Sequence, residues 1–181
     1  MHNERKIRET EYVNGRLHRE LLFSGPRGLE FQTTFNSYDD NENIKLKELY
    51  KGQRSAERLV SREYFRLKNP YTSLYEGEKG MERKIQSVYV GHNVYFEGPK
   101  SYERKVRIEM YHPKRQTQFF QGIKNHEHMI KTIEPLINKT CFFEGPNKEE
   151  RRVRCEYSDR IEYYDGPAFD EKLVRTEMLI S

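Results

Sequence analysis

Residues 95–107 read Tyr-Phe-Glu-Gly-Pro-Lys-Ser-Tyr-Glu-Arg-Lys-Val-Arg, and this pattern recurs along the whole chain. An aromatic residue stands two positions before a glycine seven times, and a glutamate follows each of these glycines after five positions. Successive motif glycines are 21 to 27 residues apart. Self-similarity at such a period indicates a repeat protein, in which each repeat is one small supersecondary element.

Three positions define each repeat, namely the aromatic residue, the glycine and the glutamate. They are Phe23, Gly25 and Glu30; Tyr50, Gly52 and Glu57; Tyr75, Gly77 and Glu82; Phe96, Gly98 and Glu103; Phe120, Gly122 and Glu127; Phe143, Gly145 and Glu150; and Tyr164, Gly166 and Glu171. Three residues after each glutamate comes a β-branched residue: Thr33, Val60, Ile85, Val106, Ile130, Val153 or Val174. A residue that is present in every repeat serves every repeat, whereas catalysis needs a unique constellation. We therefore predict a structural role for these positions.

Each repeat is predicted to be a β-hairpin. A hydrophobic and aromatic segment ends at the glycine, and a second segment with alternating character begins at the glutamate. In four repeats a proline follows the glycine directly, which ends the first strand and presets the turn. The prediction is an all-β fold, an elongated antiparallel meander of tandem β-hairpins with about fifteen strands.

The repeats account for the whole chain, so we expect a single repeat domain over residues 1–181. A half repeat covers 4–12, where Glu-Arg-Lys-Ile-Arg matches the second half of later repeats. The seven repeats span about 20–46, 47–72, 73–93, 94–117, 118–140, 141–161 and 162–179. The longer early spacings predict irregular segments at 36–47 and 66–72.

Strict alternation along the second strand would place Glu103, Lys105, Arg107 and Glu109 on one face, opposite the face of Arg104, Val106 and Ile108. The aromatic residues two positions before the glycines are expected to stack from repeat to repeat. Arginine side chains would then cover this aromatic ladder.

Composition favours a thin layer over a thick core. Hydrophobic residues make up 34% of the chain, charged residues 34% and aromatic residues 13%. Disorder is the competing interpretation, but β-branched and aromatic residues at fixed offsets argue against it. The net charge of +4 results from 33 basic and 29 acidic residues that are interspersed, which is typical of a solvated, salt-bridged surface.

No apolar run is long enough to span a bilayer, and the first residues lack the hydrophobic core of a signal peptide. We expect an intracellular, cytoplasmic protein, or a virion protein if the source is viral, and not a secreted one. Cys141 and Cys155 flank Gly145 and could face each other across one hairpin. In a chain without a secretory signal, buried thiols are the expected state, with a disulfide as the alternative.

The sequence does not favour an enzyme. It has no phosphate-binding glycine-rich loop, nucleophile motif or metal-spaced cysteine cluster. His126 and His128 could project from the same side of a strand, but a metal site needs three or four ligands, and Glu127 between them is the glutamate of its repeat. We predict no catalytic residues, no cofactor and no metal.

Basic residues directly follow five of the repeat glutamates and form a candidate interaction surface: Arg58, Arg83, Arg104, Arg151 and Lys172. With aromatic residues between them they could bind single-stranded nucleic acid, and an anionic membrane surface has similar electrostatics. The adjacent glutamates and the modest net charge weaken both interpretations. The strands at 4–10 and 172–180 should have free edges, where a specific protein could add a strand.

Three of the glycine segments resemble the opening motif of MORN (membrane occupation and recognition nexus) repeats: Leu74-Tyr75-Glu76-Gly77, Tyr95-Phe96-Glu97-Gly98 and Phe142-Phe143-Glu144-Gly145. The later glycines of MORN repeats are missing, and Glu-Arg-x-Val-Arg stands in their place. This variant is more similar to MORN-like proteins of large DNA viruses of protists and of algae and oomycetes. The resemblance implies scaffolding, protein contacts and phospholipid binding in some members, and no catalysis.

Together, the residues and the resemblance predict a non-enzymatic scaffold for protein–protein assembly, such as a minor component of a virion or of a cytoskeletal structure. The alternative is a peripheral scaffold that binds anionic phospholipid head groups. A nucleic-acid-binding module is the second alternative.

Overall fold

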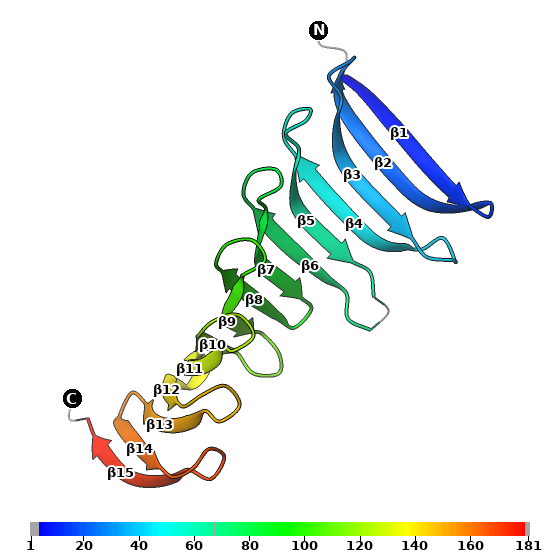
Figure 1. The fold of residues 1–181 in the computed structure, drawn as a ribbon. Coiled ribbons are helices and arrows are strands. Elements are labelled where there is room, and N and C mark those ends of the chain that lie inside the picture. The colour runs from blue at the N-terminus through cyan, green and yellow to red at the C-terminus, as the bar shows by residue number, and fades with distance from the viewer. Residues whose placement is uncertain (1–3, 67, 180–181) are drawn as a thin grey trace. The chain divides into compact units, whose positions relative to one another are not determined.

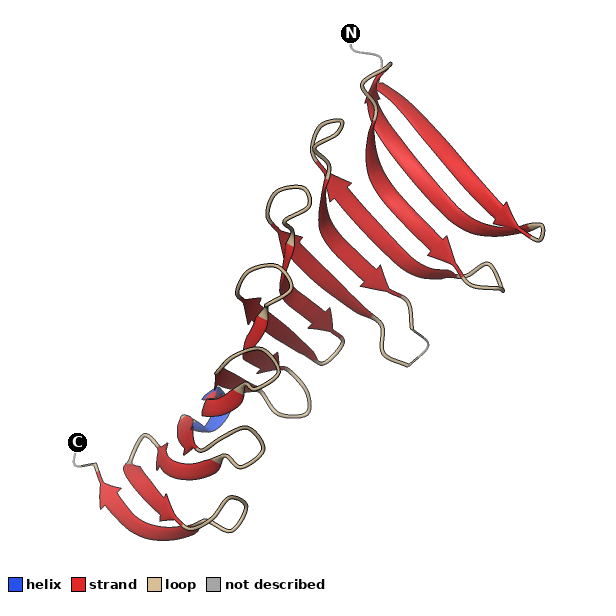
Figure 2. Cartoon of the chain, in the orientation of Figure 1, coloured by secondary structure: helices blue, strands red, loops and turns tan. Residues whose placement is uncertain are grey.

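The computed structural model describes residues 4–66 and 68–179, which form fifteen β-strands and one short 3₁₀-helix (Figure 1, Figure 2). The first seven strands are β1 (Glu4–Val13), β2 (Arg16–Pro26), β3 (Phe31–Tyr38), β4 (Ile44–Lys51), β5 (Arg58–Tyr64), β6 (Tyr71–Glu76) and β7 (Arg83–Tyr89). The next four are β8 (His92–Glu97), β9 (Arg104–Met110), β10 (Gln116–Gln121) and β11 (His128–Glu134). After the helix η1 (Pro135–Ile137) come β12 (Lys139–Glu144), β13 (Arg151–Glu156), β14 (Arg160–Asp165) and β15 (Lys172–Met178).

By its internal contacts the chain divides into two compact bodies. The N-terminal body contains β1 to β7 together with Pro99–Ser101, and the C-terminal body contains β8 to β15. Within each body, strands that follow one another in the chain pair side by side and antiparallel. The predicted all-β antiparallel meander of hairpins, with about fifteen strands, is confirmed.

Each repeat turns at its motif glycine, where the φ angle lies between 110° and 133°. The chain folds back so closely that the carbonyl oxygen four residues later lies 2.5–3.0 Å from the place a Cβ would occupy. Only glycine combines this backbone conformation with this approach. The glycine in every repeat is therefore a steric requirement of the turn.

A second residue with positive φ follows three positions after each motif glycine: Gly28, Ser55, Gly80, Ser101, Asn125, Lys148 and Phe169. In six of the turns, the next N–H donates to the carbonyl three residues earlier, as from Met81 to Glu78 at 2.9 Å. This is the geometry of a type II turn, which favours glycine or asparagine at the position with positive φ.

Phe169 holds this position with a φ of 68° and an 85% exposed side chain. Replacing Phe169 by glycine is expected to raise the free energy of unfolding by up to about 1 kcal/mol, because it relieves the strain of a left-handed conformation. Urea denaturation measures the change. Phe169→Ala keeps the strain and serves as the control, so an equal gain in both variants would contradict the explanation.

A β-bulge interrupts every hairpin at the same position. Tyr95 pairs with Arg107 and Phe96 with Lys105, so Val106 is the extra residue. The other six repeats show the same shift, with Thr33, Val60, Ile85, Ile130, Val153 and Val174 as extra residues. The β-branched residue three positions after each repeat glutamate is thus the bulge residue of its repeat.

The bulge corrects the predicted assignment of faces. Directly paired residues share a face, so Lys105 lies with Phe96 and Arg107 lies with Tyr95. Tyr95 and Phe96 are adjacent in one strand and point to opposite faces. Lys105 and Arg107 were predicted on one face and lie on opposite faces, because alternation holds only on either side of a bulge.

The strand before the first full repeat is longer than predicted. It extends to Val13 and joins β2 through Asn14 and Gly15, whose φ angles are 51° and 76°. Positive φ at both residues defines a type I′ turn, for which Asn-Gly is the strongest signal. The Asn14-Gly15 dipeptide is visible in the sequence, but it lies outside the recurring positions on which the prediction was based.

The predicted irregular segment 36–47 is mostly regular. Strand β3 continues to Tyr38 and β4 begins at Ile44, so only 39–43 form a turn. The Asp39 carboxylate closes it by accepting the N–H groups of Asn41 and Asn43, each at 2.9 Å. The segment 66–72 is irregular up to the start of β6 at Tyr71, and its residue 67 lies outside the described residues.

The sheet has little interior, as the composition predicts. Among the described residues, the buried hydrophobic side chains are those of Tyr38, Cys141 and Cys155. Small polar residues such as Ser87 and Thr132 are equally buried. A single layer leaves most side chains half-buried, so contacts between neighbouring strands must stabilise it.

Candidate interaction surfaces

The repeat glutamates connect successive hairpins. The carboxylate of Glu127 accepts a hydrogen bond from the backbone N–H of Lys105 in the preceding repeat, at 3.0 Å. The same contact joins Glu82 to Leu59, Glu150 to Met129 and Glu171 to Arg152, at 3.3, 3.0 and 2.9 Å. In each case the donor lies two residues after the glutamate of its own repeat. The bond from the Arg152 N–H stabilises the ionised Glu171 carboxylate and so lowers its pKa.

The basic residues after the glutamates also contact the next repeat or their own hairpin. Arg58 and Arg104 donate to the carbonyl oxygens of Gly77 and Gly122, at 3.2 and 3.1 Å. Cross-strand ion pairs join Arg83 to Glu76, Arg104 to Glu97 and Arg151 to Glu144. Lys172 lies exposed at the start of β15. Four of the five predicted interaction residues thus have partners within the fold.

Rings and cations alternate along one face of the C-terminal body and form what we call the cation–aromatic row. In order across the strands, the row consists of Tyr95, Arg107, Phe119, Lys131, Phe142, Arg154, Tyr163 and Arg175. Arg107 lies 4.0 Å from the ring centroid of Tyr95, and Arg175 lies 4.1 Å from that of Tyr163. Such contacts contribute about 0.5 to 1 kcal/mol each at exposed sites.

Carboxylates accompany the three arginines of the row. Arg107, Arg154 and Arg175 each form an ion pair with the glutamate two residues later, at 3.3, 3.0 and 2.8 Å. Lys131 has the apolar Ile133 at the equivalent position and lies 5.5 Å from the ring of Phe142. The positive charge of the row is therefore largely compensated, which weakens long-range attraction of a polyanion.

The opposite face differs from the predicted aromatic ladder. Lys105 lies 3.7 Å from the ring centroid of Phe120, and Arg152 lies 3.9 Å from that of Tyr164. At these two positions a cation of the preceding repeat covers the ring two residues before the glycine. Alternating charge and ring avoids a continuous exposed aromatic strip.

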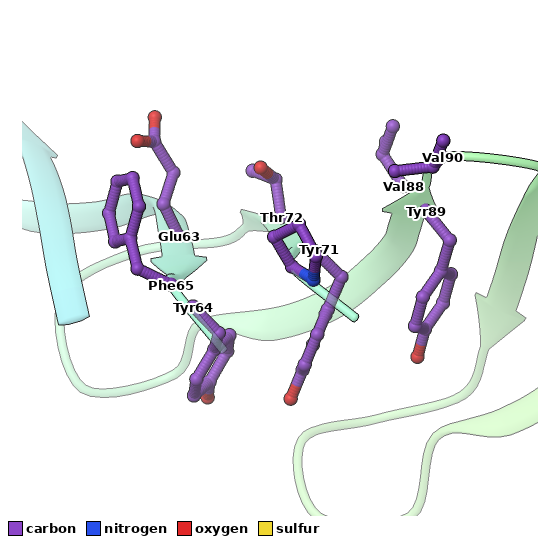
Figure 3. Close-up of a pocket in the computed structure, with 9 residues that line it drawn as sticks. Glu63, Tyr64, Phe65, Tyr71, Thr72, Val88, Tyr89 and Val90 are labelled. Atoms are coloured by element: carbon purple, nitrogen blue, oxygen red, sulfur yellow. The ribbon is translucent and has the colours of Figure 1, made fainter. Parts of the chain in front are cut away.

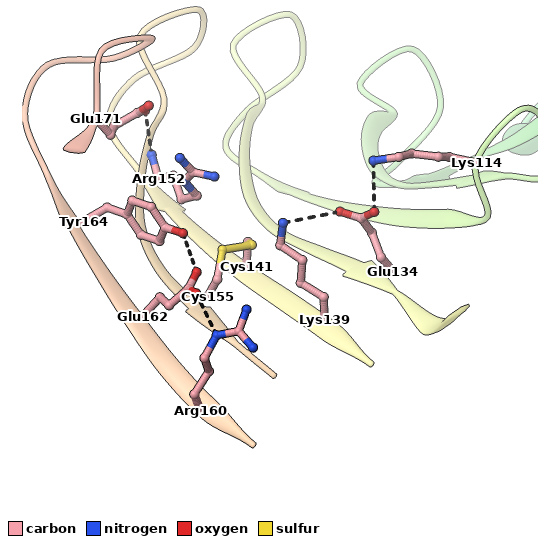
Figure 4. The surroundings of a disulfide bond; sticks show 10 residues. All are labelled: Lys114, Glu134, Lys139, Cys141, Arg152, Cys155, Arg160, Glu162, Tyr164 and Glu171. Carbon is pink, nitrogen blue, oxygen red and sulfur yellow. Dashed lines mark hydrogen bonds and ion pairs between the residues drawn. A yellow bond between two sulfur atoms is a disulfide. The ribbon is translucent and has the colours of Figure 1, made fainter. Parts of the chain in front are cut away.

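Cys141 and Cys155 form a disulfide between β12 and β13, which corrects the expectation of two thiols (Figure 4). They are directly paired in the register, with a Cα–Cα distance of 4.1 Å, and are 4% and 0% exposed. Direct pairing across two strands brings cysteines close enough to bond, and the bulge sets this register. Sequence spacing placed them in one hairpin but did not determine which residues pair.

Glu162 lies beside the disulfide and is held by two donors (Figure 4). The Tyr164 hydroxyl donates at 2.6 Å and the Arg160 Nε at 2.8 Å. These bonds lower the pKa of Glu162 to about 2. Burial, followed by the hydrogen bond to Glu162, raises the pKa of Tyr164 to about 12.

This lowered pKa predicts acid sensitivity. The folded form holds Glu162 ionised more strongly than the unfolded chain, so its contribution to stability is present above about pH 4.5 and is lost as the pH falls towards 2. Urea denaturation across this window should show a smaller loss of stability in Glu162→Gln than in the wild type. Identical pH profiles would contradict the assignment.

The buried carboxylate of Glu20 stabilises the N-terminal body. Glu20 accepts hydrogen bonds from Asn36 and Tyr38 at 2.6 and 3.0 Å and pairs with Arg8. Burial raises the pKa of Glu20, but these three partners outweigh burial and hold the pKa below its usual value. Buried charges with a full set of partners are typical of a structural network, so we assign Glu20 no catalytic role.

An apolar groove of about 270 Å³ lies at the ends of β5, β6 and β7 (Figure 3). The rings of Tyr64, Tyr71 and Tyr89 stack beside it, with centroid distances of 4.4 and 5.0 Å. Phe65 and Val90 on its rim are 47% and 89% exposed. The repeat pattern did not predict this cluster, because these tyrosines lie outside the recurring positions. The three tyrosines lie at the ends of their strands, and this placement is the sequence feature that could have indicated the cluster.

Among the described strands, two have a paired neighbour on one side only. In the N-terminal body β1 pairs with β2, and in the C-terminal body β15 pairs with β14. All seven residues of β15 are exposed, including Leu173, Val174 and Met178 at 53%, 61% and 66%. These are the two edges that the sequence predicts at 4–10 and 172–180, with residue 180 outside the described part.

The part of the chain that the structure describes contains no group of three or more His, Cys, Asp or Glu placed to hold a metal ion. His126 lies in the turn after Gly122 and His128 begins β11. Among the described residues, no helix is long and apolar enough to cross a membrane. No protein-family model matches this sequence, and no curated protein matches it.

Proposed function

We propose that this chain is a non-enzymatic structural protein that assembles with other proteins through the free edge of its sheet. The exposure of β15 carries the proposal, because every residue of this strand is accessible and one side of its backbone faces no described strand. Unpaired backbone groups on an edge can bind an added strand, and exposed apolar side chains increase the gain.

The use of charge supports protein assembly over the two electrostatic alternatives. Three arginines of the cation–aromatic row are paired with glutamates, and Arg58 and Arg104 bond glycine carbonyl oxygens within the fold. Binding to anionic lipid or to nucleic acid depends on uncompensated cations and weakens with salt. Strand addition depends on backbone hydrogen bonds and apolar contacts, so it should persist at high salt.

The test is affinity capture with the full chain from its source cells, at moderate and high salt, followed by mass spectrometry and lipid and nucleic-acid analysis. We expect a stoichiometric protein that is retained at high salt. The variant Lys131→Gln should capture it equally well, although it removes the one cation of the cation–aromatic row that has no carboxylate two residues later. Recovery of only lipid or nucleic acid, lost at high salt and reduced in Lys131→Gln, would overturn the proposal.

A further inference from the structure

The β15 edge presents a backbone donor that four junctions between repeats satisfy in the same way. At four junctions an N–H two residues after the repeat glutamate donates to the glutamate of the next repeat. The equivalent N–H on β15 is that of Leu173, two residues after Glu171. By this recurrence it points to the free side of the strand, where no described glutamate receives it.

Two cations on β15, Arg175 and Lys172, hold positions whose equivalents in earlier repeats contact the next repeat. Each earlier cation of the row pairs with a ring of its own repeat and with a ring of the next: Arg107 with Phe119, Lys131 with Phe142 and Arg154 with Tyr163. Arg175 has the ring of Tyr163 on one side, and its side chain is 59% exposed. Lys172 holds the position from which Arg104 donates to the carbonyl of Gly122.

We propose that β15 binds the first strand of a repeat hairpin of this same type, carried by a partner protein. The partner strand would have two adjacent aromatic residues, an acidic residue and a glycine, followed five residues later by a glutamate. That glutamate accepts the Leu173 N–H, the first aromatic residue pairs with Arg175, and the glycine carbonyl accepts from Lys172. This inference rests on the proposed function and specifies its partner.

A second copy of this chain does not offer such a strand in the described structure. Its free strands are β1 and β15, and both have the Glu-Arg-x-β-branched-Arg character of a second strand or a close variant of it. In the antiparallel register that places Arg5 opposite Arg175, Arg8 lies opposite Lys172, and like charges on neighbouring strands are destabilising. The charges of β15 therefore favour a first-type strand with its acidic residue and glutamate.

The probe is a fluorescent peptide that copies residues 139–157, closed by its own disulfide. It contains the first strand β12, the turn and Glu150, and in the chain β12 lies against the second strand β11. Fluorescence anisotropy measures its binding to the full protein. We expect saturable binding that Glu150→Ala in the peptide weakens at least about tenfold, since a charge-assisted hydrogen bond is lost. Glu149→Ala makes the same charge change one residue earlier and should leave affinity within about twofold.

Variants of the protein locate the site. Leu173→Pro removes the N–H on the free side of the edge strand and should abolish peptide binding, whereas Leu173→Ala keeps the N–H and should retain most of it. Circular dichroism checks that both variants fold. If Leu173→Pro does not fold, the two peptide variants on the unmodified protein decide the question. Equal effects of Glu150→Ala and Glu149→Ala, or unchanged binding to folded Leu173→Pro, would overturn the inference.

The outcomes separate this inference from the proposed function. A captured protein partner that Leu173→Pro still binds, together with no peptide binding, leaves the assembly role standing and overturns the β15 assignment. Peptide binding that depends on Glu150 and on the Leu173 N–H, without any protein captured from the source, supports the β15 assignment and overturns the assembly role. A self-associating protein that Leu173→Pro converts to a monomer would show a second copy at β15 and overturn the inference.

Discussion

Replacing Gly77 by alanine is expected to lower the free energy of unfolding by about 3 kcal/mol. Gly77 has a φ of 117°, and an added Cβ would lie 2.8 Å from the carbonyl oxygen of Met81. The alanine variant would be strained by its backbone conformation and would clash with a backbone atom that belongs to the same turn. Because the turn sets the pairing of β6 with β7, relief of the clash must shift the hairpin. Urea denaturation followed by far-UV circular dichroism measures the loss.

Gly80 in the same turn provides a matched control. It also has a positive φ, of 80°, but an added Cβ would have no heavy atom within 4 Å. Gly80→Ala should therefore lose only about 1 kcal/mol, the strain of a left-handed residue. Equal losses in both variants would show that backbone conformation alone explains the motif glycine and that the close approach does not matter.

Breaking the disulfide should have a similarly large effect. Cys141 and Cys155 are 14 residues apart, and closing a loop of this size stabilises the folded state by about 3 kcal/mol through the unfolded chain. We expect the double variant Cys141→Ala and Cys155→Ala to lose this amount. The lost stability should appear in β12 and β13 first, which hydrogen exchange can resolve by segment.

Reduction provides the control for the disulfide. Dithiothreitol should lower the stability of the wild type by a similar amount and leave the double alanine variant unchanged. If reduction has no effect on the wild type, the cysteines are thiols in the purified protein, as the sequence alone suggests.

The hairpin fold could be predicted from the sequence because its determinants are local. The spacing of Gly98 and Glu103 marks a turn, and the alternating segments around it mark two strands. Because the hairpin pattern recurs seven times in succession, a meander of neighbouring hairpins is the fold that it predicts. The two edge strands follow from the order of the repeats, so the candidate edge at 172–180 was also within reach of the sequence.

The faces of the strands were not predictable in the same way. The repeat positions identified Val106, but not that it is an extra residue opposite the pair Tyr95 and Phe96. One extra residue reverses the side on which every later side chain points, so the assignment of Lys105 and Arg107 to one face was wrong. The cation–aromatic row depends on this reversal, and only the register reveals it.

The sequence by itself determined the local chemistry of this protein: where it turns, which positions every repeat must keep, and that the second strands carry paired acids and bases. Only the tertiary structure decided which residues meet, namely the bulge in each hairpin, the bond between Cys141 and Cys155, and the path of Glu150 to the Met129 N–H. The physical reason is that turn conformation depends on neighbours in the chain, whereas pairing depends on register. A shift of one residue in register moves every side chain to the other face, and composition and spacing do not record that shift.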